Sequence, residues 1–154
     1  TYGFTLSADW KGVDFSAFFQ GSIGNDIYKL YRRSNVTFGN YDKSWLNRWH
    51  GEGTSNYVPR LSTQDHNENF TKFSSFYIED GSYLRLKNLQ LGYTFKKIPG
   101  VNKLRLYIAG QNLFTLTGYN GVEPEVSGSV LSFGFGGWTY PVQRIYSVGV
   151  NVTF

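Results

Sequence analysis

The chain has 154 residues, no cysteine and a formal net charge of +4 at pH 7. Its 12 Tyr, 13 Phe and 4 Trp residues accompany 18 Gly, a composition that suits an all-β chain. No stretch reaches the roughly 18 consecutive apolar residues of a membrane-spanning helix, and the lack of cysteine excludes disulfides and thiolate metal sites. A membrane barrel stays open, because its strands need only about 9 to 11 residues each.

Apolar and polar side chains alternate from Phe4 to Trp10 and again from Val13 to Phe19. This period of two predicts two half-buried strands, and Lys11-Gly12 between them predicts a tight hairpin turn. Trp10, next to the turn, fits an aromatic girdle at a membrane interface.

A third strand is expected over residues 83–95, with Leu89, Leu91, Tyr93 and Phe95 on one face. Leu84 and Leu86 are out of phase with these residues. The phase break predicts either a bulge or a half-strand that lies beyond the hydrocarbon.

A turn at Pro99-Gly100 leads to a fourth strand over residues 104–111. Its apolar face carries Leu104, Leu106 and Ile108, and its other face carries Arg105, Tyr107, Ala109 and Gln111.

The end of the chain has the clearest alternation. One face has Tyr146, Val148, Val150, Val152 and Phe154, and the other has Ser147, Gly149, Asn151 and Thr153. In a soluble sandwich the apolar face would meet a second sheet. In a membrane barrel it would meet lipid, and the polar face, including Arg105 and Gln111, would line the lumen.

The connections alternate between short and long, with long irregular segments at residues 24–76 and 113–143. Outer-membrane barrels combine short periplasmic turns with longer external loops. The expected fold is therefore an all-β, antiparallel up-and-down transmembrane barrel segment of about five strands with two long external loops. Five strands do not close a barrel, so the chain is expected to be a piece of a larger one.

Several blocks in order resemble the SusC/RagA family of TonB-linked outer-membrane proteins. The late-barrel block is Gly81 to Phe95 (GSYLRLKNLQLGYTF). The others are FFQGSIGNDIY at 18–28, LRLYIAGQNLFTLT at 104–117, YNGVEPE at 119–125, Tyr140-Pro141 and the ending from Tyr146 to Phe154. The resemblance covers nearly the whole chain.

The resemblance implies a 22-stranded plugged barrel in the bacterial outer membrane, of which residues 1–154 are the carboxy-terminal portion, without the plug domain and TonB box. It implies a non-enzymatic importer of oligosaccharides, or of peptides in some members. The implied partners are a SusD-like surface lipoprotein and the TonB complex. Terminal Phe154 resembles the signal read by the barrel assembly machinery, although a simple lipid-facing role also explains it.

Aromatic residues in the long loops are candidates for sugar contact, because a ring offers a flat apolar surface to a pyranose. The alternative is that these rings pack the loops or contact the lipoprotein. The candidates are Trp45, Trp49, Tyr57, Trp138 and Tyr140.

Other polar residues carry weaker signals. His50 and His66 have no ligand-like spacing to a partner, so zinc is not expected, and no arrangement supports catalysis. Glu123 and Glu125 are interpreted first as loop-shaping residues and second as calcium or substrate contacts. The basic group of Lys29, Arg32 and Arg33 is interpreted as a solvated loop base, not as a nucleic-acid site.

Two alternatives to the transporter barrel stay open at this point. One is a soluble carbohydrate-binding β-sandwich that uses the same aromatic residues. The other is a complete small barrel whose long loops hide additional strands.

Overall fold

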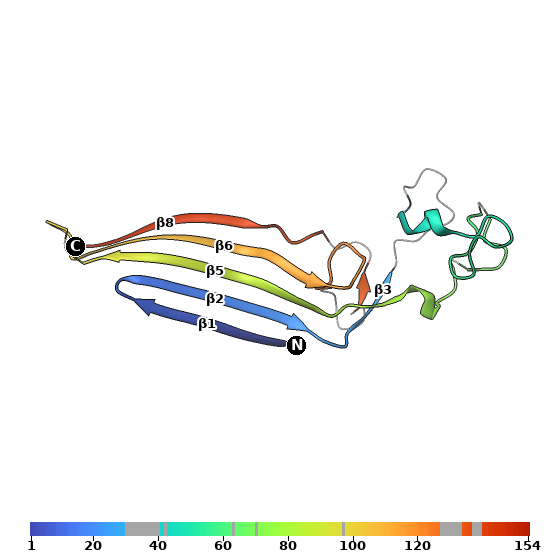
Figure 1. Ribbon diagram of the computed structural model, residues 1–154, viewed down its shortest axis with the longest axis horizontal. Coiled ribbons are helices and arrows are strands. Elements are labelled where there is room, and N and C mark those ends of the chain that lie inside the picture. The colour runs from blue at the N-terminus through green and yellow to red at the C-terminus, as the bar shows by residue number, and fades with distance from the viewer. Residues whose placement is uncertain are drawn as a thin grey trace.

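The computed structural model describes residues 1–29, 41, 43–62, 64–69, 71–96, 98–126, 134–136 and 140–154. They form a five-stranded antiparallel sheet with strand order β1-β2-β5-β6-β8, and a three-stranded sheet with order β4-β3-β7. The small sheet and the longer loop lie beyond one end of the large sheet (Figure 1). No helix in this part of the chain is long and apolar enough to cross a membrane.

The five predicted strands are confirmed. They are Tyr2–Trp10 (β1), Val13–Ser22 (β2), Tyr83–Phe95 (β5), Lys103–Thr117 (β6) and Ile145–Thr153 (β8). Only the end of β6 was wrong, because the expected strand stopped at Gln111 and the observed strand continues for six more residues.

A bulge explains the phase break in β5. Lys87 is skipped in the pairing of β5 with both β2 and β6, and Asn112 and Leu113 are skipped on β6, where Asn112 has φ 53°. After the skip, Leu86 pairs with Phe19 and with Phe114. The bulge therefore places Leu84 and Leu86 on the same apolar face as the second half of β5. Of the two explanations predicted from the sequence, the bulge is confirmed.

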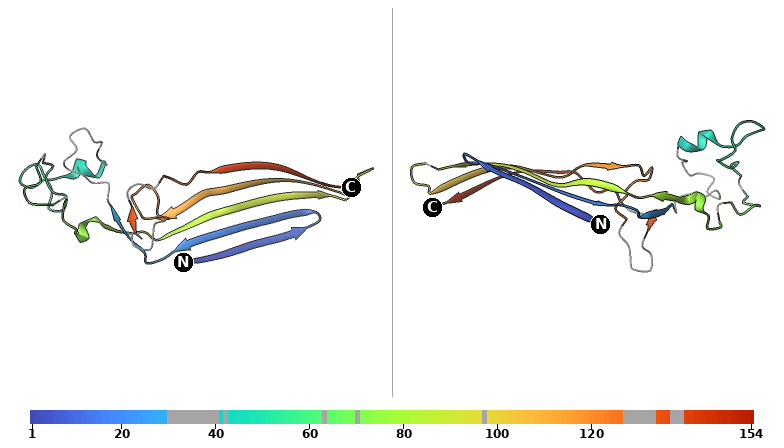
Figure 2. Two further views of the ribbon diagram at one scale, coloured as in Figure 1. Left: turned by 180° about the vertical axis from the view of Figure 1, so that it is seen from behind. Right: turned by 60° about the horizontal axis from the view of Figure 1, so that its bottom comes forward.

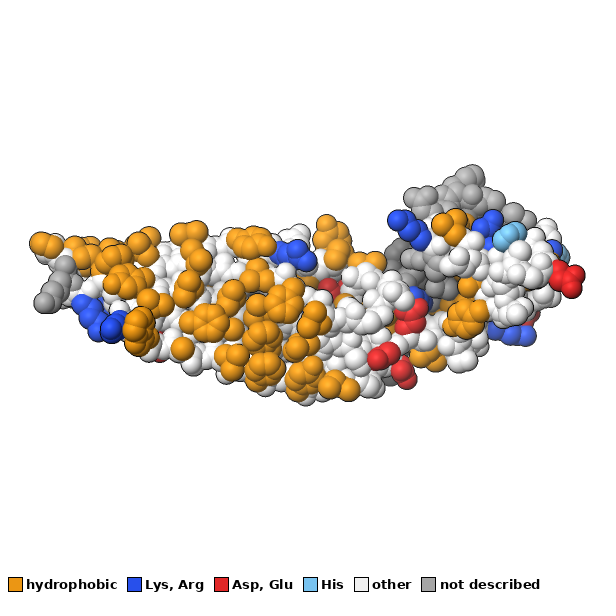
Figure 3. All heavy atoms as spheres, in the orientation of Figure 1, with side chains coloured by type: hydrophobic (Ala, Val, Ile, Leu, Met, Phe, Trp, Pro, Cys, Tyr) orange, Lys and Arg blue, Asp and Glu red, His pale blue; other side chains and the backbone are white. Residues whose placement is uncertain are grey.

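The register gathers the apolar side chains of all five strands on one face of the sheet. One row runs from Ala8 through Phe15, Leu91 and Ile108 to Val148. Most of these side chains are exposed, and they cover the face seen in Figure 3. Such a face requires an apolar environment, which the described residues do not supply.

Aromatic rings cluster toward both ends of the apolar face. Phe4 stacks on Phe19 with ring centroids 4.9 Å apart, and Phe114 meets Phe19 edge-on at 6.5 Å. At the other end, Tyr93 and Phe95 make a T-shaped pair at 4.7 Å, near the exposed Trp10. Girdles of this kind mark the two water interfaces of membrane barrels.

The two alternative folds do not agree with this arrangement. Within the described residues no second sheet covers the apolar face, and the right-hand view in Figure 2 shows the large sheet as a single layer. The β-sandwich interpretation is therefore wrong. The small-barrel interpretation is also wrong for the described residues, because β1 and β8 remain the two edges of the sheet.

The long segments contain more regular structure than the sequence analysis predicted. The short elements are Asp26–Lys29 (β3), Ile78–Asp80 (β4), Phe135–Gly136 (β7), and the 3-10 turns Lys43–Asn47 (η1) and Ser75–Tyr77 (η2). Ile27 of β3 is fully buried in this small sheet. A Cβ atom at Gly81 or Gly136 would lie 2.5–2.6 Å from the Ile27 side chain, so both positions require glycine.

Replacing a residue of the apolar face by lysine is expected to destabilise the barrel. Val148→Lys places a charge in the apolar row and should lower the free energy of unfolding by about 2–4 kcal/mol if the row lies near the bilayer midplane. Urea unfolding of the parent protein in lipid vesicles measures the effect. Ser147→Lys, one residue away on the opposite face, is the matched control, and an equal loss for both variants would contradict the assignment of faces.

Candidate functional site

The polar face of the large sheet carries an ion pair that crosses one strand. Arg105 of β6 donates through Nε to Asp14 Oδ1 of β2 at 2.9 Å, and its Nη2 donates to Asp14 Oδ2. Gly92 of β5 lies between them, and a Cβ atom there would be 2.6 Å from Asp14 Oδ1 and 2.7 Å from Arg105 Nη2. The absence of a side chain at Gly92 is therefore what allows the pair to form.

On the same face, the ring of Tyr107 packs between Arg105 and Gly149. Arg105 lies over the ring of Tyr107, with 4.9 Å from Cζ to the ring centroid. Tyr107 pairs with Gly149 of β8, and its ring occupies the space that a side chain at Gly149 would need. The ring shields one side of the guanidinium, a favourable cation–π arrangement.

The six predicted lumen residues all lie on this polar face. Arg105 pairs with Asn151, Ala109 with Ser147, and Lys103 with Thr153, while Gly149 and Gln111 occupy the same side of their strands. The register thus separates them from the apolar face. That this side faces the lumen of a closed barrel remains a prediction.

A buried ion-pair network lies where the large sheet meets its outer loops. Arg85 of β5 has a side chain only 3% exposed, and its Nη2 donates to Glu123, whose side chain is 4% exposed. Its Nη1 donates to Glu125 Oε2 at 2.8 Å and its Nε to Thr115 Oγ1 at 2.8 Å. Lys87, the bulged residue, donates to both oxygens of Glu125 at 2.7–2.9 Å.

Glu123 also joins the two ends of the loop between β6 and β8. Its Oε1 accepts from the backbone N–H of Glu125 at 3.0 Å, and its Oε2 accepts from that of Val142 at 3.2 Å. Every oxygen of this carboxylate is thus bonded within the chain. The geometry supports the loop-shaping interpretation of Glu123 and Glu125, and within the described residues no group of three acidic or histidine side chains could hold a metal ion.

A second ion pair fixes the same loop to the small sheet. Lys29 of β3 is buried, donates to Glu79 of β4 and lies 5.7 Å from the ring centroid of Tyr119. The interpretation of the basic group as a solvated loop base was therefore wrong for Lys29, while Arg32 and Arg33 lie outside the described residues. The other oxygen of Glu79 accepts from the backbone N–H of Asn120 at 3.3 Å. Residues 119–125 are therefore held from both sides, by β3 and β4 and by β5.

Asp80 closes the turn from β4 into β5. The hydroxyl and the backbone N–H of Ser82 both donate to Asp80 Oδ1, at 2.6 and 2.9 Å. These two hydrogen bonds hold the pKa of Asp80 below its usual value.

The aromatic candidates for substrate contact have different surroundings. Trp45 is 3% exposed and packs edge-on against Tyr41 at 5.9 Å, a geometry that favours the packing alternative for this ring. Trp49 is 39% exposed, Tyr57 76% and Tyr140 77%. Trp138 lies outside the described residues.

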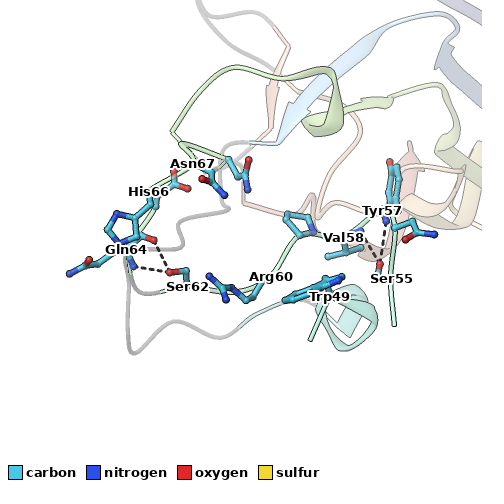
Figure 4. A pocket seen from close by; sticks show the side chains of 13 residues that line it. Trp49, Ser55, Tyr57, Val58, Arg60, Ser62, Gln64, His66 and Asn67 are labelled. Atoms are coloured by element: carbon cyan, nitrogen blue, oxygen red, sulfur yellow. Dashed lines mark hydrogen bonds between the residues drawn. The ribbon is translucent and has the colours of Figure 1, made fainter. Parts of the chain in front are cut away.

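Trp49 and Tyr57 border the same cleft, which has a volume of about 470 Å³ and lies within the longer outer loop (Figure 4). Polar side chains form most of the remaining lining, from Ser55 and Asn56 to His66, Asn67 and Asn69. Tyr140 is not among the lining residues, so the structure brings together two of the four predicted rings that it describes.

The final residue, Phe154, follows β8 with an exposed ring on the apolar side of the alternation. Exposure fits a lipid contact. Recognition by the assembly machinery remains a prediction.

Sequence reasoning missed the ion pairs of Arg85, Lys29 and Arg105. Their partners are 38, 50 and 91 residues away along the chain. The available signal was a charged residue at a strand position where neighbours are apolar or small, as at Arg85 between Leu84 and Leu86. That signal identifies one partner, not the pair.

Comparisons with known proteins agree with this architecture. No protein-family model matches the chain. TonB-dependent receptor P3 of Formosa agariphila is 34% identical over 167 residues, covering 100% of the chain and 16% of the relative. TonB-dependent receptor SusC of Bacteroides thetaiotaomicron is 28% identical, covering 99% of the chain and 15% of the relative.

Solved structures give the same result. The RagAB peptide importer in its closed-closed state matches with a TM-score of 0.77 and 30% identity, over 99% of this chain and 17% of that one. The chain is a barrel segment of the SusC/RagA family of TonB-dependent receptors. It belongs to the bacterial outer membrane, and it spans about one sixth of the length of the relatives it matches.

Breaking the buried network of this SusC/RagA-family segment should loosen the outer loop. Glu123→Ala leaves Arg85 buried without its buried carboxylate partner. The local stability of residues 118–126 should fall by about 3–5 kcal/mol. Hydrogen exchange of these amides in the parent protein measures the loss. Glu68→Ala removes an exposed ion pair with Lys72 and should change local stability by less than about 1 kcal/mol. Unchanged exchange in Glu123→Ala would contradict the assigned role.

Filling the space at Gly92 should separate Asp14 from Arg105. Gly92→Ala is expected to lower stability by about 1–3 kcal/mol, because a methyl group there overpacks the pair. Gly118→Ala, where a Cβ meets nothing within 4 Å, is the control. Thermal unfolding in detergent compares the two variants, and equal midpoints would show that the pair does not depend on Gly92.

Proposed function

We propose that the protein to which this segment belongs is a TonB-energised outer-membrane importer of oligosaccharides that works with a SusD-like surface lipoprotein. The observation that carries the proposal is the separation of faces in the large sheet. All five strands present apolar side chains on one face, and the other face is mostly polar apart from residues such as Phe18 and Ile145, as a wall between lipid and a wet lumen requires.

The relatives support the transport part of the proposal. The matched proteins are named TonB-dependent receptors, and the matched structures are described as a peptide importer. The segment's share in import would be a part of the barrel wall and two outer loops.

Two substrate classes follow from different observations. Peptides are suggested by the 29–30% identity to the RagAB importer. Oligosaccharides are favoured by the polar cleft with the exposed rings of Trp49 and Tyr57, because few apolar side chains line it. We therefore place oligosaccharides first and peptides second.

Deleting the gene of the parent protein in its source organism should abolish uptake of at least one fluorescently labelled oligosaccharide. A protonophore should give the same loss in the wild type, because TonB-linked transport depends on cellular energy. Uptake of labelled peptides is measured in the same cells to test the second class.

Membrane fractionation with an antibody against residues 43–62 provides the control for location. The proposal expects the signal in the outer-membrane fraction and co-purification of a surface lipoprotein. Unchanged uptake of every oligosaccharide and peptide in the deletion strain, or a signal confined to the soluble fraction, would overturn it.

A further inference from the structure

The cleft in the outer loop has a defined frame. The backbone N–H of Trp49 donates to Val58 O at 2.8 Å and closes the segment between them. Ser55 Oγ accepts from the backbone N–H groups of Tyr57 and Val58 at 3.3 and 3.1 Å. Figure 4 shows the two bonds of Ser55 on the same side of the cleft as the Trp49 ring, so one wall of the cleft is preformed.

The opposite wall is organised by serine and aspartate turns. Ser62 Oγ donates to Gln64 O at 2.7 Å and accepts from its backbone N–H at 3.3 Å. Asp65 Oδ2 accepts from the backbone and the hydroxyl of Thr71, both at 3.1 Å. Asp65, the one carboxylate among the described lining residues, is therefore engaged in holding the loop.

Several polar groups of the cleft remain available to a ligand. Across the described part of the chain, the guanidinium of Arg60, the ring of His66 and the side-chain amides of Asn56, Gln64 and Asn67 make no hydrogen bond or ion pair. Amides donate and accept, as sugar hydroxyls require. Among the described lining residues Arg60 carries the one fixed positive charge, and a guanidinium binds carboxylate or sulfate oxygens well.

We propose that this cleft is a binding site for an acidic glycan, in which Trp49 stacks on a sugar ring and Arg60 binds its carboxylate or sulfate group. The proposal rests on the proposed function and names the substrate class of its outer loop. The residues that line the cleft belong to the loop segment 49–69, which lies beyond the end of the large sheet (Figure 1), so the cleft would hold the glycan before the lumen does.

A peptide fits the cleft less well. Extended peptides are commonly bound by addition to an exposed strand, and residues 49–62 and 64–69 contain no strand. Of the lining residues that the structure describes, only Val58 and Pro59 have aliphatic side chains, too few for a set of side-chain pockets.

Binding to the purified full-length transporter, without its lipoprotein, tests the proposal by isothermal titration calorimetry. The probes are a tetragalacturonate, a sulfated carrageenan tetrasaccharide, maltotetraose and tetraglutamate. The wild type is expected to bind at least one acidic glycan more tightly than maltotetraose and tetraglutamate. Arg60→Gln should weaken that binding by about tenfold or more, the range of a charge-assisted hydrogen bond, and should leave maltotetraose binding unchanged.

Trp49→Ala should weaken binding of the acidic glycan by about tenfold, because the stacking surface is lost. Two matched controls lie outside the cleft: Leu46→Ala removes an exposed apolar side chain of the same loop, and Arg144→Gln removes an exposed cation. Both should bind the acidic glycan like the wild type. Hydrogen exchange of residues 43–62 confirms that the variants keep the loop folded.

The outcomes separate this proposal from the proposed function. If no acidic glycan binds, if Arg60→Gln and Trp49→Ala bind like the controls, or if tetraglutamate alone depends on Arg60, the cleft is not an acidic-glycan site. Import of an oligosaccharide by the same variants would then still support the transporter. Loss of all oligosaccharide uptake in the gene deletion, together with Arg60-dependent binding, supports both.

Discussion

The unbroken apolar face of the large sheet depends on the bulge at Lys87. Without it, the side-chain period of two would put Leu84 and Leu86 on the polar face and Arg85 on the apolar one. The bulge also leaves Lys87 free of ladder pairing and available to Glu125. One inserted residue thus keeps the lipid side apolar and supplies a cation to the network that holds the outer loop.

The strands of the large sheet could be predicted because an interface between lipid and water demands strict alternation, and alternation is visible in a single sequence. Even the irregularity in β5 was detectable, since Leu84 and Leu86 broke the phase. The continuation of β6 past Gln111 was not, because Gly110 and Asn112 interrupt the apolar alternation before Phe114 and Leu116 resume it in the same phase.

The loops were less predictable for a physical reason. The strands β3, β4 and β7 have only two to four residues each, and their pairing depends on partners far along the chain. Among the predicted rings, Trp45 and Trp49 were indistinguishable by residue type, yet one is buried and the other borders the cleft. Exposure in a loop follows from tertiary packing, which a local pattern does not contain.

The position of the cleft depends on a chain of aromatic contacts that starts in the small sheet. Tyr28 of β3 meets Tyr77 edge-on at 5.9 Å, Tyr77 meets Phe76 at 5.1 Å, and Phe76 meets Tyr57 at 5.1 Å. Tyr77 also donates through its hydroxyl to Asn69 O at 2.6 Å, at the far side of the cleft. Because Lys29, the neighbour of Tyr28, is bound to Glu79 and lies near Tyr119, the cleft and the loop 119–125 share one support. A change that displaces β3 is therefore expected to disturb both outer loops together, whereas a change in the lumen wall at Asp14 or Arg105 leaves that support intact.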